Sequence, residues 1–174
     1  IISLVDIGIN MEVEETGQSF ESNALKKAKE YQKLSGEITL AEDSGLEICS
    51  LGGQPGVMSA RYGGEELNDS ERVNYLLKEM KNIDGWNRGA RFVSVVVLLN
   101  NNGELEIISQ GYLNGFISHQ KIGSNGFGYD PIFWLPERST TTAKLSLLEK
   151  NKISHRGKAL KAIKPTLKSL FCIE

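Results

Sequence analysis

Ala-Glu-Asp-Ser-Gly-Leu, residues 41–46, ends an apolar stretch in two adjacent carboxylates and leads into a glycine-bearing segment. Residues 38–42 predict a buried strand, so Glu42 and Asp43 are expected at its end. Two carboxylates at such a place can hold a hard divalent cation, while the glycines let a polyanion approach main-chain N–H groups. The pattern indicates phosphoryl or pyrophosphoryl transfer, with capping of the turn by the same acids as the plainer alternative.

Three helices are predicted around this stretch. Ser19 can cap a helix over residues 20–34, whose apolar residues recur at helical spacing. The same periodicity predicts a helix over residues 69–80 and a last one over residues 157–170, which Pro165 is expected to bend.

Two strands are predicted in the middle of the chain. Residues 90–99 and 104–113 are extended and apolar, and they flank residues 100–103, Asn-Asn-Asn-Gly, which favour a hairpin turn. Strands that alternate with helices around a central hairpin predict the α/β class, with helices packed against a mixed sheet. Because no repeat or linker divides the chain, we expect a single domain over residues 1–174.

The composition limits the possible partners. The chain has 20 Lys and Arg against 22 Asp and Glu, a formal charge of −2, and so lacks the overall positive charge that nucleic acid or anionic lipid attracts. Its longest apolar run, residues 92–99, is too short to span a bilayer, and residues 1–6 lack the basic end of a signal peptide. Cys49 and Cys172 predict free thiols in a reducing compartment. We therefore expect a cytoplasmic protein without a nucleic-acid or membrane partner.

Five further blocks stand in a fixed order beside residues 41–46. They are Ser-Phe-x-x-Asn-Ala-x-x-Lys-Ala at 19–28, Leu-Gly-Gly-Gln-Pro-Gly-Val-x-Ser-Ala-Arg-Tyr-Gly at 51–63, Ala-Arg-Phe-Val at 90–93, Asn-Gly-Phe-Gly-Tyr-Asp-Pro-Ile-Phe at 125–133 and Glu-Lys-Asn-Lys-Ile-Ser-His-Arg-Gly at 149–157. From about Glu14 to Leu170 the chain thereby resembles the inosine/xanthosine triphosphate pyrophosphatase family, the XTP/dITP diphosphatases.

This resemblance implies an elongated α/β fold with a central substrate cleft, and a homodimer. The implied reaction is hydrolysis of ITP, dITP and XTP to the nucleoside monophosphate and pyrophosphate, which removes deaminated purines from the nucleotide pool. Mg²⁺ is the implied cofactor. A metal-activated water would attack the α-phosphorus, and no covalent enzyme intermediate is needed.

The resemblance also assigns the residues at the phosphates. On their own, Glu12, Glu14 and Glu15 fit a solvated acidic loop. The family match instead implies that Glu14 and Asp43 are Mg²⁺ ligands, that Asp43 also acts as general base, and that Ser44 contacts the phosphate chain. Arg61 remains open between a phosphate ligand and a salt-bridge partner.

The aromatic loop at 125–133 has two interpretations. Its aromatic side chains fit a hydrophobic core, but an aromatic face can also stack on a purine while a carboxylate or main-chain group bonds its edge. The resemblance implies the second role and places four residues in the base pocket: Phe127, Gly128, Tyr129 and Asp130.

The basic residues before the last helix would by themselves be surface charge, and an isolated histidine is more often structural than catalytic. The resemblance implies that Lys150, His155 and Arg156 bind substrate. Donors that face O6 are satisfied by hypoxanthine or xanthine, whereas the 6-amino group of adenine leaves them unpaired. This would select deaminated purines.

One departure from the family concerns the start of the chain. The family's opening strand and its Thr/Ser-x-Asn-x-x-Lys phosphate loop have no counterpart here, so we expect an N-terminally truncated domain. A catalytically impaired nucleotide-binding protein is the alternative of another class. A pyrophosphatase for modified pyrimidine nucleotides is a third possibility.

Overall fold

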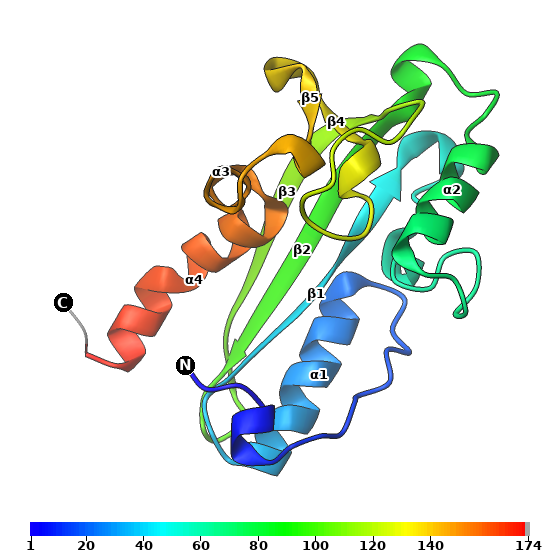
Figure 1. Ribbon diagram of the computed structural model, residues 1–174. Coiled ribbons are helices and arrows are strands. Elements are labelled where there is room, and N and C mark those ends of the chain that lie inside the picture. Colours follow the sequence, from blue (N-terminus) through cyan, green and yellow to red (C-terminus); the bar gives the residue numbers. More distant parts are fainter. Residues whose placement is uncertain (173–174) are drawn as a thin grey trace.

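The computed structural model describes residues 1–172, and residues 173–174 of the predicted domain lie outside the described part. Five strands form one sheet in sequence order, with every pairing antiparallel. The long strands β1, β2 and β3 run the length of the molecule, and the short β4 and β5 extend the sheet at one end (Figure 1). Their bounds are β1 (Thr39–Ile48), β2 (Gly89–Leu99), β3 (Leu105–Ile117), β4 (Phe133–Leu135) and β5 (Thr140–Thr141).

Four α-helices accompany the sheet. α1 contacts β1 and β2, whereas α4 contacts β2 and β3 from the other side (Figure 1). Their bounds are α1 (Phe20–Ser35), α2 (Asp69–Glu79), α3 (Leu147–Ile153) and α4 (His155–Leu170). The predicted α/β class is confirmed, although the described sheet contains only antiparallel pairs.

The helix ends follow from local capping. The Ser19 hydroxyl accepts a hydrogen bond from the N–H of Ser22, and Gly36 ends α1 in the left-handed conformation that glycine adopts freely. Asn68 caps α2 in the same way. The observed ends of α1 and α2 agree with the predicted ends to within one residue. The last helix begins two residues earlier than predicted, at His155, and contains Pro165.

The two faces of the long strands carry different cores. On the α1 side, alternate strand residues meet small helix residues in a cluster of Phe20, Ala24, Ala28, Ala41, Val93, Val95, Val97 and Leu99. On the α4 side, Val96 packs against Ala159 and Ile163. Alternation along a strand explains this division, since neighbouring residues point to opposite faces.

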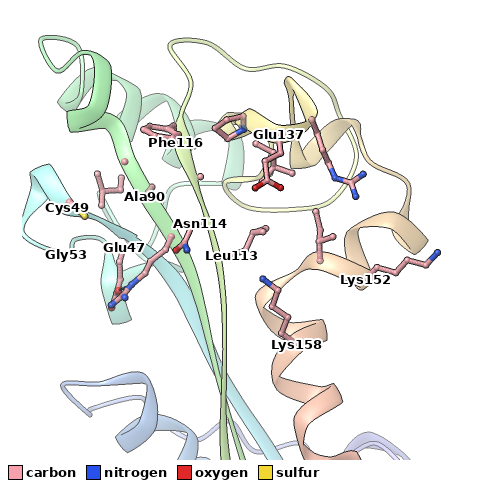
Figure 2. A pocket seen from close by; sticks show the side chains of 18 residues that line it. Glu47, Cys49, Gly53, Ala90, Leu113, Asn114, Phe116, Glu137, Lys152 and Lys158 are labelled. Carbon is pink, nitrogen blue, oxygen red and sulfur yellow. Dashed lines mark hydrogen bonds and ion pairs between the residues drawn. The ribbon is translucent and has the colours of Figure 1, made fainter.

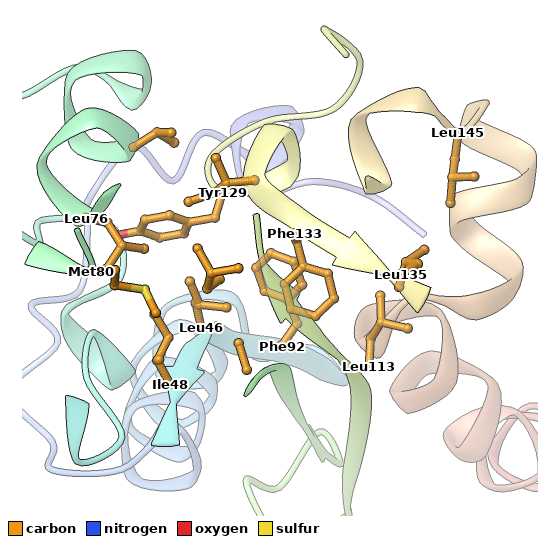
Figure 3. Packing of buried hydrophobic residues seen from close by; sticks show 14 residues of the cluster. Leu46, Ile48, Leu76, Met80, Phe92, Leu113, Tyr129, Phe133, Leu135 and Leu145 are labelled. Atoms are coloured by element: carbon orange, nitrogen blue, oxygen red, sulfur yellow. The ribbon is translucent and has the colours of Figure 1, made fainter. Parts of the chain in front are cut away.

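A larger cluster fills the end of the molecule near α2 and β4. Phe92 and Phe133 lie 4.3 Å apart between ring centroids and are surrounded by aliphatic side chains from β1, β3 and α2 (Figure 3). Fully buried members include Leu46, Ile48 and Leu76. This core supports the loop that carries residues 125–133.

The first predicted strand was placed correctly but ended too early. β1 continues from Glu42 to Ile48, so Asp43 lies inside the strand and not at its end. Consecutive strand residues face opposite sides, and Glu42 and Asp43 do so here. Among residues 1–172, none of the helices has the length and apolar character needed to cross a membrane. Cys49 and Cys172 are exposed free thiols.

Candidate active site

Asp43 is buried against α1, with 7% of its surface exposed. Asn23 and Lys27 lie one helical turn apart on α1 and present both side chains to it. The Asn23 amide donates to Asp43 Oδ2 at 3.2 Å, and the Lys27 ammonium donates to Asp43 Oδ1 at 2.9 Å. The strand and the helix thereby hold one carboxylate with both oxygens engaged.

A second carboxylate reaches the same lysine. Lys27 Nζ donates to Glu15 Oε1 at 2.7 Å, and the Arg61 guanidinium lies 3.7 Å from Glu15 Oε2. Glu14, in contrast, is exposed, and its main-chain oxygen accepts from Lys26. The structure therefore places Glu15 beside Asp43, and the side chain of Glu14 outside this contact.

Burial and ion pairing act in opposite directions on the pKa values of Asp43 and Lys27. Burial raises the pKa of the Asp43 carboxyl, as does the nearby charge of Glu15, while Lys27 and Asn23 act in the opposite direction. Burial alone would lower the pKa of Lys27, but its bonds to Glu15 and Asp43 outweigh burial and raise it. A carboxyl with a raised pKa beside a fixed ammonium suits proton transfer from water.

Glu15 and Asp43 supply carboxylate oxygens, the donor type that a hard divalent cation binds. Residues 1–172 contain no group of three or more His, Cys, Asp or Glu side chains placed to hold a metal by themselves. Mg²⁺ needs less from a protein, because it keeps several waters and takes further ligands from substrate phosphates. Glu15 and Asp43 already share one cation, the ammonium of Lys27, which shows that one positive centre can contact both carboxylates.

On the opposite face of β1, Glu42 pairs with Arg156 at the start of α4. Arg156 Nε donates to Glu42 Oε1 at 3.0 Å, and Nη2 lies 2.9 Å from Oε2, so both carboxylate oxygens are engaged. The Ser94 hydroxyl donates to Glu42 Oε1, and the Ser44 hydroxyl accepts from Arg156 Nη2 at 3.2 Å. Burial would raise the pKa of Glu42, but Arg156 outweighs burial and lowers it.

Arg156 lines a pocket of roughly 420 Å³ with three other predicted residues, Phe127, Lys150 and His155. The ring of Phe127 is 60% exposed, with Lys150 Nζ 4.6 Å and the Arg156 guanidinium carbon 5.5 Å from its centroid. Cations over an aromatic face are mutually attractive. The pocket can thus accept a flat, electron-rich ligand with acceptor groups on its edge.

His155 forms the floor of this pocket. Its ring stacks on Phe92, with centroids 4.8 Å apart and 17° between the planes. Burial lowers the pKa of His155 to about 4, and the charge of Arg156 contributes. The imidazole is therefore neutral at pH 7. Its buried Nδ1 has no hydrogen-bond partner within residues 1–172.

The other three residues of the predicted base pocket, Gly128, Tyr129 and Asp130, do not line it. Tyr129 is core, with its hydroxyl bonded to the Ser59 carbonyl oxygen at 3.0 Å. Asp130 is 1% exposed and accepts from Lys150 Nζ and the main-chain N–H of Phe127. The N–H of Gly128 donates to Asp69, outside the pocket. Asp130 thus fixes two pocket residues from inside, while its own acceptors are already occupied.

Sequence reasoning assigned no role to three residues of the carboxylate cluster. Asn23 and Lys27 were noted only as letters of a motif, although their spacing of four on a predicted helix indicates a shared face. Glu15 belongs to the same acidic segment, but the family match implied its neighbour Glu14 as the ligand. Arg61, left open, is a salt-bridge partner of Glu15 in the structure.

A further cavity lies away from all these residues. It measures roughly 1020 Å³ at the end of the sheet, between the strand ends and the α3–α4 side. Figure 2 shows Cys49, Ala90 and Phe116 on one side and Lys152 and Lys158 on the other. None of the predicted site residues lines it.

Fold and site together define an α/β protein with a carboxylate–lysine cluster on one face of β1 and an aromatic, basic pocket on the other. Comparison with known proteins identifies the family to which this protein belongs. The chain belongs to the Ham1 family, whose model matches residues 1–166.

Individual relatives agree along nearly the whole chain. A dITP/XTP pyrophosphatase of Bacillus licheniformis is 47% identical over 165 residues, which are 95% of this chain and 84% of the relative. A protein of the same name from Clostridium perfringens is 46% identical, over 98% of this chain and 86% of the relative. The Staphylococcus aureus Ham1 structure superimposes with a TM-score of 0.88 at 38% identity, covering 97% of this chain and 86% of that one.

Proposed function

We propose that the protein hydrolyses non-canonical purine nucleoside triphosphates, ITP, dITP and XTP, to the monophosphate and pyrophosphate. The observation that carries this proposal is the arrangement around β1: Asp43 joins the cluster of Lys27 and Glu15, and the residues on either side of it in sequence hold Arg156. Relatives named dITP/XTP pyrophosphatases support the substrate class. No observation favours the alternative of a binding protein without catalysis.

In this proposal the triphosphate lies at the carboxylate cluster. Glu15 and Asp43 would hold Mg²⁺, with the sequence prediction of Glu14 kept as the competing ligand. The metal supplies charge neutralisation and a more acidic water. Asp43 accepts the proton of the attacking water, and Lys27 and Arg61 balance charge on the phosphates.

The purine ring would lie in the pocket of Phe127, Lys150, His155 and Arg156. An aromatic ring and a guanidinium plane can stack on it, and the guanidinium and ammonium donors suit an O6 acceptor. Tyr129 and Asp130 would support the pocket from behind. The Ser44 hydroxyl lies on the face of β1 that carries Arg156, so it would contact the substrate from that side and not beside Asp43. Nucleoside triphosphates are abundant in the cytoplasm, and this supports a cytoplasmic location as part of the proposal.

The test is Mg²⁺-dependent product release from ITP and ATP, with pyrophosphate and orthophosphate quantified separately. Pyrophosphate from ITP, little from ATP, and a loss on the order of 10²-fold or more in Asp43→Asn are expected, because the variant lacks the proton acceptor. Glu37→Gln, at an exposed position just before β1, is the matched control. Binding of ITP without turnover would replace the proposal by the nucleotide-binding alternative, and a preference for modified pyrimidine triphosphates would change the substrate.

The metal ligand is tested in the same assay by titrating Mg²⁺. Glu15→Gln should raise the concentration that gives half-maximal rate on the order of tenfold more than Glu14→Gln does, because only Glu15 shares a cation with Asp43. The reverse order would make Glu14 the ligand.

The protein is also proposed to be a homodimer through the cavity shown in Figure 2. Trp86 is 87% exposed and packs edge-on against Phe116 of the cavity wall, with ring centroids 5.5 Å apart. The wall carries both acids, such as Glu47 and Glu137, and bases, such as Lys152 and Lys158. A surface with both signs can complement itself about a twofold axis.

A further inference from the structure

Glu42 occupies an unusual position for a half-buried carboxylate beside a proposed metal site. It neighbours Asp43 in sequence, yet it faces α4 and contacts none of Asn23, Lys27 or Glu15 in residues 1–172. Its 20% exposed side chain is instead committed to a two-point contact with Arg156. Such paired contacts between guanidinium and carboxylate fix orientation as well as charge.

The contact leaves one edge of Arg156 free. Nε and Nη2 are bound to Glu42 and Ser44, whereas Nη1 has no hydrogen-bond partner within residues 1–172. The side chain is 41% exposed and lies over Phe127 in the pocket. An arginine held along one edge presents the donors of its other edge in a fixed direction.

Ser94 extends the support into the sheet. It is completely buried on β2, pairs with Ser44 in the strand register, and donates to the same Glu42 oxygen that receives Arg156 Nε. The carboxylate is therefore itself oriented by a residue that cannot move independently of the core. Arg156 is thus connected to two strands and not only to its own helix.

We propose that Glu42, oriented by Ser94, is a positioning residue that sets the purine selectivity of the pocket by fixing the guanidinium of Arg156. This rests on the proposed function. A free arginine could turn away from a 6-amino group, whereas a fixed one leaves donors facing donors and penalises adenine. Fixing the side chain in advance also reduces the entropy lost on binding a 6-oxo purine.

A double-mutant cycle tests the proposal, with Glu42→Gln, Arg156→Lys and the double variant assayed on ITP and ATP at saturating Mg²⁺. Glu42→Gln should lower the ITP-to-ATP ratio of kcat/KM on the order of tenfold, through the KM for ITP, with kcat changed less than about threefold. The double variant should be no less selective than Arg156→Lys, because Glu42 acts through Arg156.

Glu37→Gln is the matched control, since it removes an exposed carboxylate just before β1 that lines neither the pocket nor the proposed interface. Its ITP-to-ATP ratio should equal that of the wild type. An unchanged ratio in Glu42→Gln, additive effects in the cycle, or a raised Mg²⁺ requirement with unchanged selectivity would overturn the proposal. If Glu42→Gln does not fold, Ser94→Ala should shift the ratio in the same direction by a smaller factor.

A second readout does not depend on turnover. The arginine side-chain N–H resonance of Arg156 should shift and exchange faster with solvent in Glu42→Gln, and remain as in the wild type in Glu37→Gln. If the wild type fails to hydrolyse ITP, the proposed function fails. An unchanged Arg156 resonance in Glu42→Gln overturns the positioning role whether or not ITP is hydrolysed.

Discussion

Glu42 and Asp43 are neighbours in sequence and serve opposite faces of one strand. Asp43 bonds to Lys27 of α1, and Glu42 bonds to Arg156 of α4. Had both carboxylates pointed to one face, their mutual repulsion would have required a shared cation. Strand alternation instead gives each carboxylate its own partner. Asp43 therefore belongs to the proposed phosphate site, while its neighbour Glu42 supports Arg156 of the base pocket.

His155 makes the stability of the protein depend on pH. Its pKa is about 4 when folded, because burial opposes the charged form, against an ordinary value of 6.5. As the pH falls from 6.5 towards 4, His155 becomes protonated in the unfolded chain but stays neutral in the folded protein. The contribution of His155 is therefore complete above 6.5 and lost progressively below it, by about 2 kcal/mol at pH 5.

Urea unfolding of wild type and His155→Asn at pH 7.5 and pH 5 measures this contribution. The variant is less stable at both values because the stacking on Phe92 is lost, but its stability should fall by about 2 kcal/mol less between them. If the unfolding free energy fell equally between pH 7.5 and pH 5 in the wild type and in His155→Asn, the folded protein would protonate His155 as the unfolded chain does.

Close packing of α4 on β3 places the start of the helix at the pocket. Ser94 and Ser109 are buried beneath it, and the Ser109 hydroxyl donates to the Ala159 carbonyl oxygen at 3.0 Å. Gly111 permits the approach. A Cβ there would overlap the main-chain oxygen of His155 and lie 2.7 Å from the main-chain nitrogen of Ala159.

Gly111→Ala should therefore push α4 away from the sheet. We expect a loss of about 1–3 kcal/mol in unfolding free energy from overpacking, together with a raised KM for ITP because His155 and Arg156 move with the helix. Chemical denaturation and steady-state kinetics check the two effects. Gln110→Ala, at the neighbouring exposed position, is the control, and a variant of wild-type stability would contradict the close approach.

At the scale of the whole molecule, the candidate site and the large cavity occupy different parts of the long sheet. The carboxylate cluster and the base pocket share β1, whereas the large cavity lies beyond the strand ends with Trp86 beside it. Exposed aromatic side chains beside a concave surface commonly mark protein interfaces. Catalysis and assembly are thus proposed to use separate surfaces.

Trp86→Arg should convert the proposed dimer into a monomer, because an unpaired charge would be buried at the interface. Light scattering coupled to size exclusion, at several protein concentrations, gives the mass directly. Leu34→Arg changes another exposed apolar residue, far along the chain at the end of α1, and should leave the dimer intact. A monomeric wild type, or a dimer insensitive to Trp86→Arg, would reject this interface.

Local signals predicted most of the elements. The capping serine and the terminal glycine of α1, and the glycine-bearing turn after β2, act within a few residues, so their positions are legible in the sequence. The full length of β1 could not be predicted from the sequence, because Asp43 and Ser44 are polar and resemble the end of a strand. They are tolerated inside the strand because Lys27 and Arg156, distant in sequence, satisfy them.

The amino-acid sequence determined the α/β class, the helices and hairpin, and the motifs that mark the family, since all of these depend on local pattern or on contiguous blocks. Only the tertiary structure decided which side chains act together. It placed Glu15 on the lysine that also holds Asp43, and left the side chain of Glu14 outside this contact. It also buried Tyr129 and Asp130 in the interior and paired Glu42 with Arg156. These outcomes depend on which face of a strand meets which helix, and packing between distant segments sets that.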